Sequence, residues 1–135
     1  MLIRVWAFLL CFFLLFGVSG HAAEEVSVKV AQILGNPSHY LMKEVVLQGK
    51  VIQIVHKEII NGKTLWEALL SDGSTLGVAY VMGIVEAGRV PVEGDRLRLR
   101  CIVFGVTTYE TVVGSTNEAV LCVHGEELGD ITFIE

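Results

Sequence analysis

Residues 44–81, EVVLQGKVIQIVHKEIINGKTLWEALLSDGSTLGVAYV, decide the fold of this chain. The segment holds three runs rich in β-branched and other apolar residues, a composition that favours strands. The predicted strands cover residues 44–57, 63–70 and 75–81. An Asn-Gly pair at residues 61–62 and an Asp-Gly pair at residues 72–73 separate them. Both dipeptides favour tight hairpin turns, so the segment is expected to form a three-stranded meander.

Gly49 interrupts the first of these strands. A residue without a side chain weakens a strand interior and marks a bulge, a sharp bend or the close approach of another backbone. The first strand is therefore expected to be long and bent at Gly49.

The segment after the meander, residues 82–93, contains Gly83, Gly88 and Pro91. Glycine and proline are the strongest breakers of regular structure. We therefore predict that this segment is a connection with at most one short helical turn.

The clearest alternation in the chain lies in the fourth predicted strand, which starts at residues 94–95. Its two alternating series are Arg96, Arg98 and Arg100 on one side and Leu97, Leu99 and Cys101 on the other. Successive side chains of a strand point to opposite faces, so the arginines are expected to share one face. Residues 107–117 are expected to be a loop or an irregular ribbon, residues 119–124 a fifth strand, and residues 131–134 a short edge strand.

Residues 24–40 precede the meander and are predicted to contain a short helix, because their apolar residues recur at helical spacing. Gly35-Asn36-Pro37 is expected to end it, since glycine favours helix ends and the residue before proline avoids the helical region.

The first 22 residues have the parts of a secretory signal peptide. Arg4 supplies the positive charge, residues 5–16 form an unbroken apolar run, and Gly20-His21-Ala22 offers small residues before a cleavage site. We expect residues 1–22 to be a signal peptide and residues 23–135 to be one domain, located in the periplasm or secreted. The alternative is an uncleaved anchor that ties the domain to a membrane through residues 5–18.

Export would place the cysteines of the domain in a compartment where disulfides form. Cys101 and Cys122 are the two that remain after processing, and an even number of cysteines in an exported chain favours a structural disulfide. Its loop of about 20 residues would stabilise the fold by roughly 3 kcal/mol. The alternative is a pair of buried, reduced thiols.

Several local patterns together resemble one family. They are Asn36 to Tyr40, Lys43 to Val51, Leu70 to Gly73 and Val92 to Leu99. The chain is similar to exported bacterial OB-fold proteins, particularly the tRNA-anti-like group of small secreted proteins and lipoproteins. It departs from them at Leu41-Met42, where such proteins usually place a glycine before the lysine. The resemblance implies an all-β class, with a five-stranded Greek-key barrel that binds through the face of its second and third strands.

Two sets of side chains are candidate ligand contacts. Trp66 and Tyr80 fall on the predicted second and third strands, where they would stack on the bases of a nucleic acid or else fill the barrel interior. Arg96, Arg98 and Arg100 would form a row able to hold carboxylates or phosphates. Their alternative role is a solvated outer face that keeps a strand edge from aggregating.

Other chemistry is not expected. The chain has a formal net charge of −5, which disfavours general nucleic-acid binding. Cys122 and His124 share a side of a strand, but they lack the spacing and further ligands of a zinc module, so no metal or cofactor is expected. No serine lies in a nucleophile motif, so no enzyme activity is expected.

The function expected from the sequence is that of an exported binding module for a protein or a small anionic ligand. Two alternatives remain. One is a binder of single-stranded nucleic acid, and the other is a structural accessory domain of an envelope complex.

Overall fold

The computed structural model describes residues 28–74, 77–86 and 88–134. Its elements are α2 (Val30–Gly35), α3 (Pro37–Tyr40), β1 (Glu44–Ile60), β2 (Lys63–Ser71), β3 (Val78–Val85), β4 (Arg96–Glu110), β5 (Thr116–His124), the 3-10 helix η2 (Glu126–Leu128) and β6 (Thr132–Ile134). The expected signal peptide and its cleavage site lie outside the described residues. Within those residues, no helix is long and apolar enough to cross a membrane.

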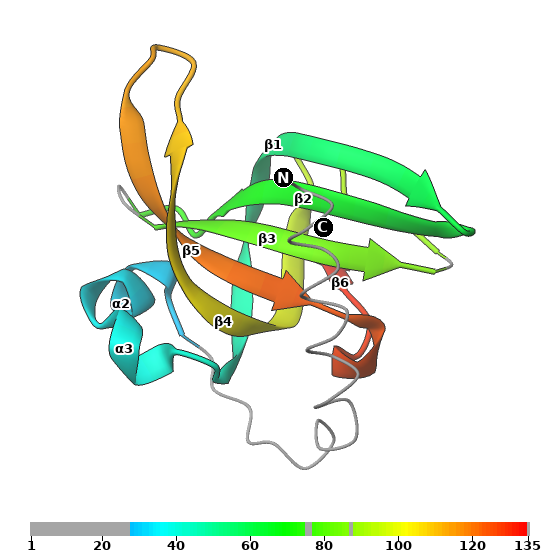
Figure 1. The fold of residues 1–135 in the computed structure, drawn as a ribbon, viewed down its shortest axis with the longest axis horizontal. Coiled ribbons are helices and arrows are strands. Elements are labelled where there is room, and N and C mark those ends of the chain that lie inside the picture. Colours follow the sequence, from blue (N-terminus) through cyan, green and yellow to red (C-terminus); the bar gives the residue numbers. More distant parts are fainter. Residues whose placement is uncertain (1–27, 75–76, 87, 135) are drawn as a thin grey trace.

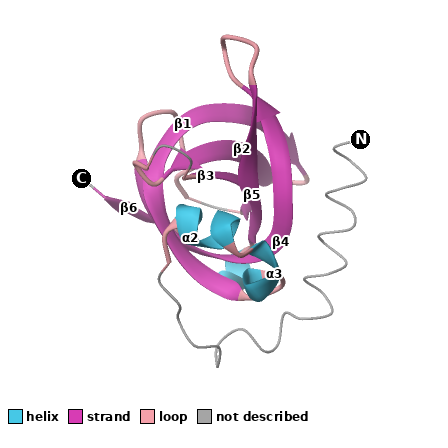
Figure 2. Ribbon diagram, turned by 90° about the vertical axis from the view of Figure 1, so that its left-hand side faces the viewer, coloured by secondary structure: helices cyan, strands magenta, loops and turns pink. Residues whose placement is uncertain are grey.

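The strands close into a ring. β1 pairs antiparallel with β2, β2 with β3 and β5 with β4, while β3 and β5 pair in parallel. The pairing of β4 with β1 completes the circle, and β6 adds to β4 alone (Figures 1 and 2). The sequence-based expectation of a β-rich barrel with a short N-terminal helical segment is confirmed at this level.

β1 belongs to both sides of the ring because it changes partner along its length. Residues 44–50 pair with β4, and residues 50–60 pair with β2. Figure 1 shows the strand turning between these two parts. A Cβ on Gly49 would lie 2.4 Å from the carbonyl oxygen of Ser71, so only glycine fits where β1 approaches the end of β2.

The hairpin between β1 and β2 has the predicted two-residue turn. Asn61 and Gly62 have φ angles of 52° and 78°, and positive φ at both positions is the requirement of a type I′ turn. The turn fixes the register of the strands that follow it.

The barrel interior holds one apolar core, built from alternate residues of all five ring strands. α2 closes one end of the barrel, where Val30 and Ile33 are 1% and 0% exposed. The Asp72 carboxylate accepts a hydrogen bond of 2.9 Å from the Val30 amide, which ties the start of α2 to the β2–β3 turn.

Each ring strand extends past one of its predicted ends, and β3 and β4 do so where a connection or a loop was expected. β3 continues through Gly83 to Val85, where a connection between strands was expected, and β4 runs to Glu110 through part of the expected loop. Gly83 is a site of close approach rather than a breaker, since a Cβ there would lie 2.3 Å from the Trp66 ring. Cross-strand pairing with β2 and β5 therefore overrides the local signal.

The helical segment is also divided differently. α2 ends at Gly35 as predicted, but Pro37 then begins α3 instead of ending helical structure. Proline fits the first turn of a helix because the amide it lacks would have no partner there.

Candidate functional site

The site that best suits a ligand is a cleft of about 520 Å³ beside the start of α2. It lies where the bend of β1, the end of β2 and the ends of β4 and β6 meet. Its lining residues are Val28, Lys29, Gln48, Gly49, Lys50, Ile52, Ser71, Asp72, Gly73, Arg96 and Ile134. Because Lys29, Lys50 and Arg96 are three of the four charged residues among them, we call it the basic cleft.

Two of these cations are direct cross-strand neighbours. Lys50 of β1 pairs in register with Arg96 of β4, and both side chains point to the outside of the barrel, where they are exposed. Like charges directly opposite each other destabilise a strand pair. Neither Lys50, Arg96 nor Lys29 forms an ion pair with another residue of the described ranges.

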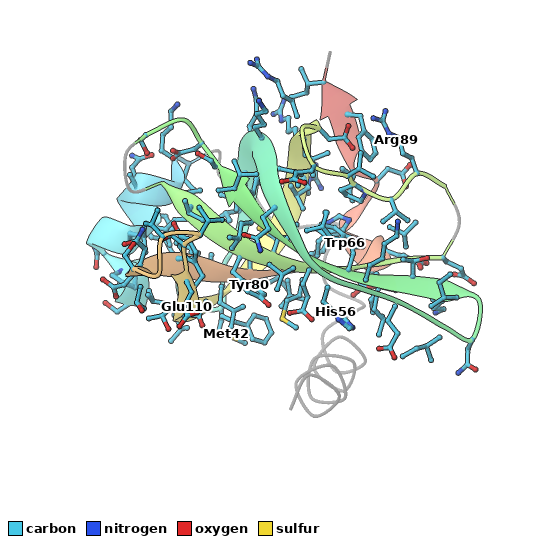
Figure 3. All side chains as sticks on the ribbon, turned by 90° about the horizontal axis from the view of Figure 1, so that it is seen from above. Met42, His56, Trp66, Tyr80, Arg89 and Glu110 are labelled. Atoms are coloured by element: carbon cyan, nitrogen blue, oxygen red, sulfur yellow. The ribbon has the colours of Figure 1, made fainter. Side chains whose placement is uncertain are left out.

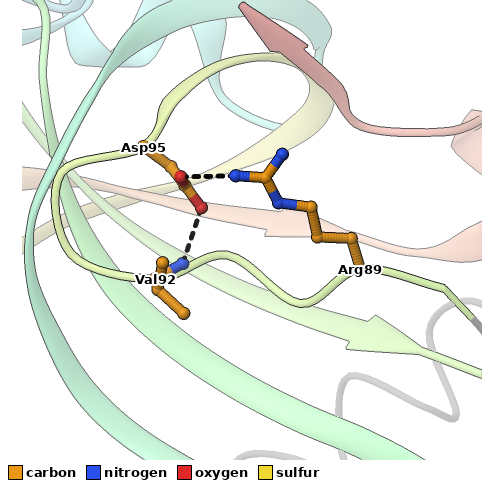
Figure 4. A network of polar contacts seen from close by, with 3 residues as sticks. All are labelled: Arg89, Val92 and Asp95. Carbon is orange, nitrogen blue, oxygen red and sulfur yellow. Dashed lines mark hydrogen bonds and ion pairs between the residues drawn. The ribbon is translucent and has the colours of Figure 1, made fainter.

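Asp95, the acidic residue nearest to Arg96 in sequence, already binds two other groups. One carboxylate oxygen of Asp95 lies 2.7 Å from Nη2 of Arg89, and the other accepts a 2.9 Å hydrogen bond from the Val92 amide (Figure 4). These contacts fold the β3–β4 connection on itself. Asp95 is therefore held by its own loop and by Arg89.

Asp72, the fourth charged group of the cleft, faces backbone amides. Burial raises the pKa of its carboxyl, but hydrogen bonds from Ser74 and from the amides of Ala31 and Val30 outweigh burial and lower it. Asp72 thus stays ionised and holds α2 and the β2–β3 turn together. Its role is to position the cleft wall that carries Lys29.

The predicted arginine row divides between two clefts. Arg96 lines the basic cleft, whereas Arg98 and Arg100 line a smaller one of about 370 Å³ together with Asp130. β6 pairs alongside, with Ile134 opposite Arg96 and Thr132 opposite Arg98. The three arginines share the outward face of β4, but of the three Arg96 is the one that lines the same cleft as Lys29 and Lys50.

The two predicted aromatic contacts lie on opposite sides of the barrel wall. Trp66 is inside, 1% exposed, and its Nε1 has no hydrogen-bond partner in the described part of the chain. Tyr80 is half-buried on the outside and donates a hydrogen bond to the Glu67 carboxylate. Burial, and then the hydrogen bond and the charge of Glu67, raise the pKa of Tyr80. Trp66 therefore fills the interior, and the two rings form no common platform (Figure 3).

Another cleft, of about 680 Å³, lies at the end of β3, and its charged lining residues are mostly acidic. His124 lines it and is 3% exposed, with Nδ1 2.6 Å from the Arg100 carbonyl oxygen, so Nδ1 carries the proton. Burial lowers the pKa of His124, so the ring is neutral. The guanidinium of Arg89 lies 4.1 Å from the centre of the Phe133 ring on another wall of this cleft.

Carboxylates also line this cleft. Burial and a hydrogen bond with Glu86 raise the pKa of Glu126. In the described ranges, no group of three or more histidine, cysteine or acidic side chains is arranged to hold a metal ion.

Cys101 and Cys122 are free, fully buried thiols in the structure. The register pairs Cys122 with Val103, which makes the two cysteines diagonal neighbours on the interior side of β4 and β5. Burial, and next a hydrogen bond with Cys122, raise the pKa of Cys101 well above its usual value. Diagonal neighbours are about 7–8 Å apart, whereas a disulfide joins residues whose Cα atoms are at most about 7 Å apart. The two cysteines are therefore not at disulfide distance in the structure, and the disulfide stays a prediction.

Sequence reasoning singled out Arg96 but missed Lys29 and Lys50. Lys50 could be found only from the register of β1 against β4, which no local pattern reveals. Lys29 reaches the cleft because Asp72 fixes the start of α2.

Comparison with known proteins assigns no family to this arrangement. No protein-family model matches the chain, and no match was found among curated proteins. The function is therefore argued from the cleft itself.

Proposed function

We propose that the chain is an exported OB-fold module that binds a small anionic ligand in the basic cleft. The OB-fold assignment is supported by the ring order β1-β2-β3-β5-β4 with a parallel β3–β5 pair, since OB-folds are five-stranded Greek-key barrels. Export is supported by the sequence of residues 1–22, and N-terminal sequencing of the secreted or periplasmic protein tests it.

The observation that carries the ligand assignment is the opposed pair Lys50 and Arg96, with Lys29 beside the same cleft. Holding two cations opposite each other costs stability unless an anion lies between them. Carboxylates and phosphates form charge-assisted hydrogen bonds with such groups, and arginine binds them with two parallel bonds.

The size of the cleft favours a small ligand over a polymer. Its volume of about 520 Å³ lies within the range of about 300–1,000 Å³ that is typical of small-molecule sites. A single-strand binder also needs accessible aromatic rings, and Trp66 is inside the barrel.

The test is a calorimetric titration of the full chain with citrate and, separately, with inorganic phosphate. Removing one charge-assisted contact costs about 1.5–3 kcal/mol, so Arg96→Gln and Lys50→Gln should each weaken binding by roughly 10-fold to 100-fold. Arg98→Gln is the matched control because Arg98 lies outside this cleft, on the same face of the same strand. The affinity of the Arg98→Gln variant for each anion should stay within about twofold of that of the parent chain.

Two results would count against the proposal. One is the absence of binding by both anions, and the other is an equal loss of affinity in the Arg96 and Arg98 variants. A labelled single-stranded oligonucleotide is titrated in parallel at low and moderate salt. Salt-dependent binding of the oligonucleotide that Arg96→Gln leaves intact would favour the nucleic-acid alternative.

A further inference from the structure

The cleft of about 680 Å³ at the end of β3 opens where β5 leaves β3. Gly83 is the last residue of β3 that pairs with β5, and its partner His124 is the last residue of β5. β3 continues to Val85, whereas the chain turns away through η2 and returns as β6, which pairs with β4. Residues from the end of β3, from η2 and from β6 therefore line one cleft, which we call the acidic cleft.

Three carboxylates reach the acidic cleft from separate segments. Glu86 follows β3, Glu126 begins η2, and Asp130 lies between η2 and β6. Glu86 and Glu126 are close enough to share a hydrogen bond, so their like charges repel each other when both are ionised. Lys63 attracts Glu126 from outside the lining, but none of the three acids forms an ion pair within the described ranges. A cation in the cleft would relieve this repulsion.

Arg89 is the one cation among the described lining residues, and its charge is used elsewhere. Its Nη2 atom lies 2.7 Å from the Asp95 carboxylate, and its guanidinium lies 4.1 Å from the centre of the Phe133 ring (Figure 4). These contacts hold Arg89 against the β3–β4 connection and β6. The acidic cleft therefore keeps an excess of negative charge.

His124 gives a second, independent indication of a ligand. Its side chain lines the acidic cleft and is 3% exposed. Nδ1 donates a hydrogen bond to the Arg100 carbonyl oxygen, so the other nitrogen of the neutral ring, Nε2, is an acceptor. In the described part of the chain no donor binds Nε2. Because buried polar atoms are normally hydrogen-bonded, Nε2 is suited to accept a hydrogen bond from a ligand in the cleft.

The remaining walls suit the hydrocarbon part of an organic molecule. Val85, Ile131 and Phe133 line the cleft, and they are partly buried against the main core. The volume lies within the range of about 300–1,000 Å³ that is typical of small-molecule sites. A hydrated metal ion would leave these apolar walls unused. The described acids and His124 are also not grouped closely enough to hold a metal ion.

We propose that the acidic cleft binds an organic ammonium ion that carries an apolar chain. The carboxylates of Glu86 and Glu126 attract the positive charge, an N–H group donates to Nε2 of His124, and the chain packs on the apolar walls. Phe133 lines this cleft and Ile134 lines the basic cleft, so the two sites lie on opposite faces of β6. The proposal is independent of the anionic ligand.

The first test is a calorimetric titration of the full chain with hexylammonium chloride and with the neutral analogue 1-hexanol. Glu126→Gln removes one charge at an exposed position and should weaken hexylammonium binding by at least about fivefold. Glu118→Gln is the matched control, because it makes the same charge change at an exposed position of β5 outside the cleft. Glu118→Gln and Arg96→Gln should each stay within about twofold of the parent chain.

Four results would overturn the proposal. They are no binding of hexylammonium, an equal loss of affinity in the Glu126 and Glu118 variants, binding of 1-hexanol as tight as that of hexylammonium, and binding of calcium in place of hexylammonium. The last result would make the cleft a metal site. The Arg96→Gln arm separates this site from the basic cleft, since failure of one leaves the other unaffected.

The second test follows the histidine rings by ¹⁵N NMR during the hexylammonium titration. The Nε2 signal of His124 should shift as it accepts a hydrogen bond, and the shift should saturate at the same concentration as the calorimetric signal. His39 of α3 and His56 of β1 are internal controls, because neither lines the acidic cleft. A His124 signal that stays in place, or that moves no more than those of His39 and His56, would contradict the proposal.

Discussion

Replacing Lys50 by glutamate should stabilise the barrel while it abolishes anion binding. Lys50 lies directly opposite Arg96, and neither has an acidic partner in the described ranges. The substitution turns a repulsive cross-strand pair into an attractive one. Such pairs are each worth about 0.2–1 kcal/mol, and both side chains are exposed and screened by water. We therefore expect an increase in the free energy of unfolding of about 0.5–1 kcal/mol.

The change can be measured by thermal unfolding followed by circular dichroism. A gain of this size should raise Tm by about 2–4 °C for a domain of this length. Because the cause is electrostatic, most of the gain should disappear at 1 M salt, where the screening length is about 3 Å. Citrate should no longer raise Tm, because the cleft then holds an additional negative charge.

Lys57→Glu is the matched control, since Lys57 is exposed on the same strand and pairs with Trp66 rather than with a cation. It should leave Tm within about 1 °C of the parent. The reasoning fails if Lys50→Glu is no more stable than this control. It also fails if a gain in Tm persists unchanged at high salt.

Three further predictions concern the interior of the barrel. Gly83→Ala should lower the free energy of unfolding by about 1–3 kcal/mol in denaturant titrations, because the added methyl would lie 2.3 Å from the Trp66 ring; a neutral effect would contradict this packing. His124 has a pKa below its ordinary value of about 6.5 because it is buried. On acidification, the His124 ring therefore binds a proton in the unfolded chain before it does so in the folded chain. The free energy of unfolding should therefore fall as the pH drops from about 6.5 through the folded pKa, and a dependence that persists in His124→Gln would exclude this origin. If the predicted disulfide forms in the exported protein, alkylation without reduction should leave Cys101 and Cys122 unlabelled, as measured by mass. The alkylation is done in denaturant because burial alone also protects thiols. Labelling of both cysteines would disprove the disulfide.

Local sequence determined the turn of the first hairpin and which side chains of a strand face outward. Asn61-Gly62 forms the predicted two-residue turn because few other dipeptides accept positive φ at both positions. The alternation of Arg96, Arg98 and Arg100 with apolar residues places the arginines on the outside of β4, since strand side chains alternate between faces. These properties depend on neighbours in the chain and were therefore predictable.

Only the tertiary structure decided where strands end and which side chains meet. Gly83 was predicted to end the third strand, but it lies within β3 and its missing side chain lets the Trp66 ring pack against the strand. Lys50 meets Arg96 because β1 leaves β2 at its bend and closes the ring against β4. Lys29, Lys50 and Arg96 line one cleft because the ring closes between β1 and β4 and because Asp72 holds the start of α2. Sequence periodicity assigns a side chain to a face of its own strand, but only the pairing of distant strands selects its neighbours.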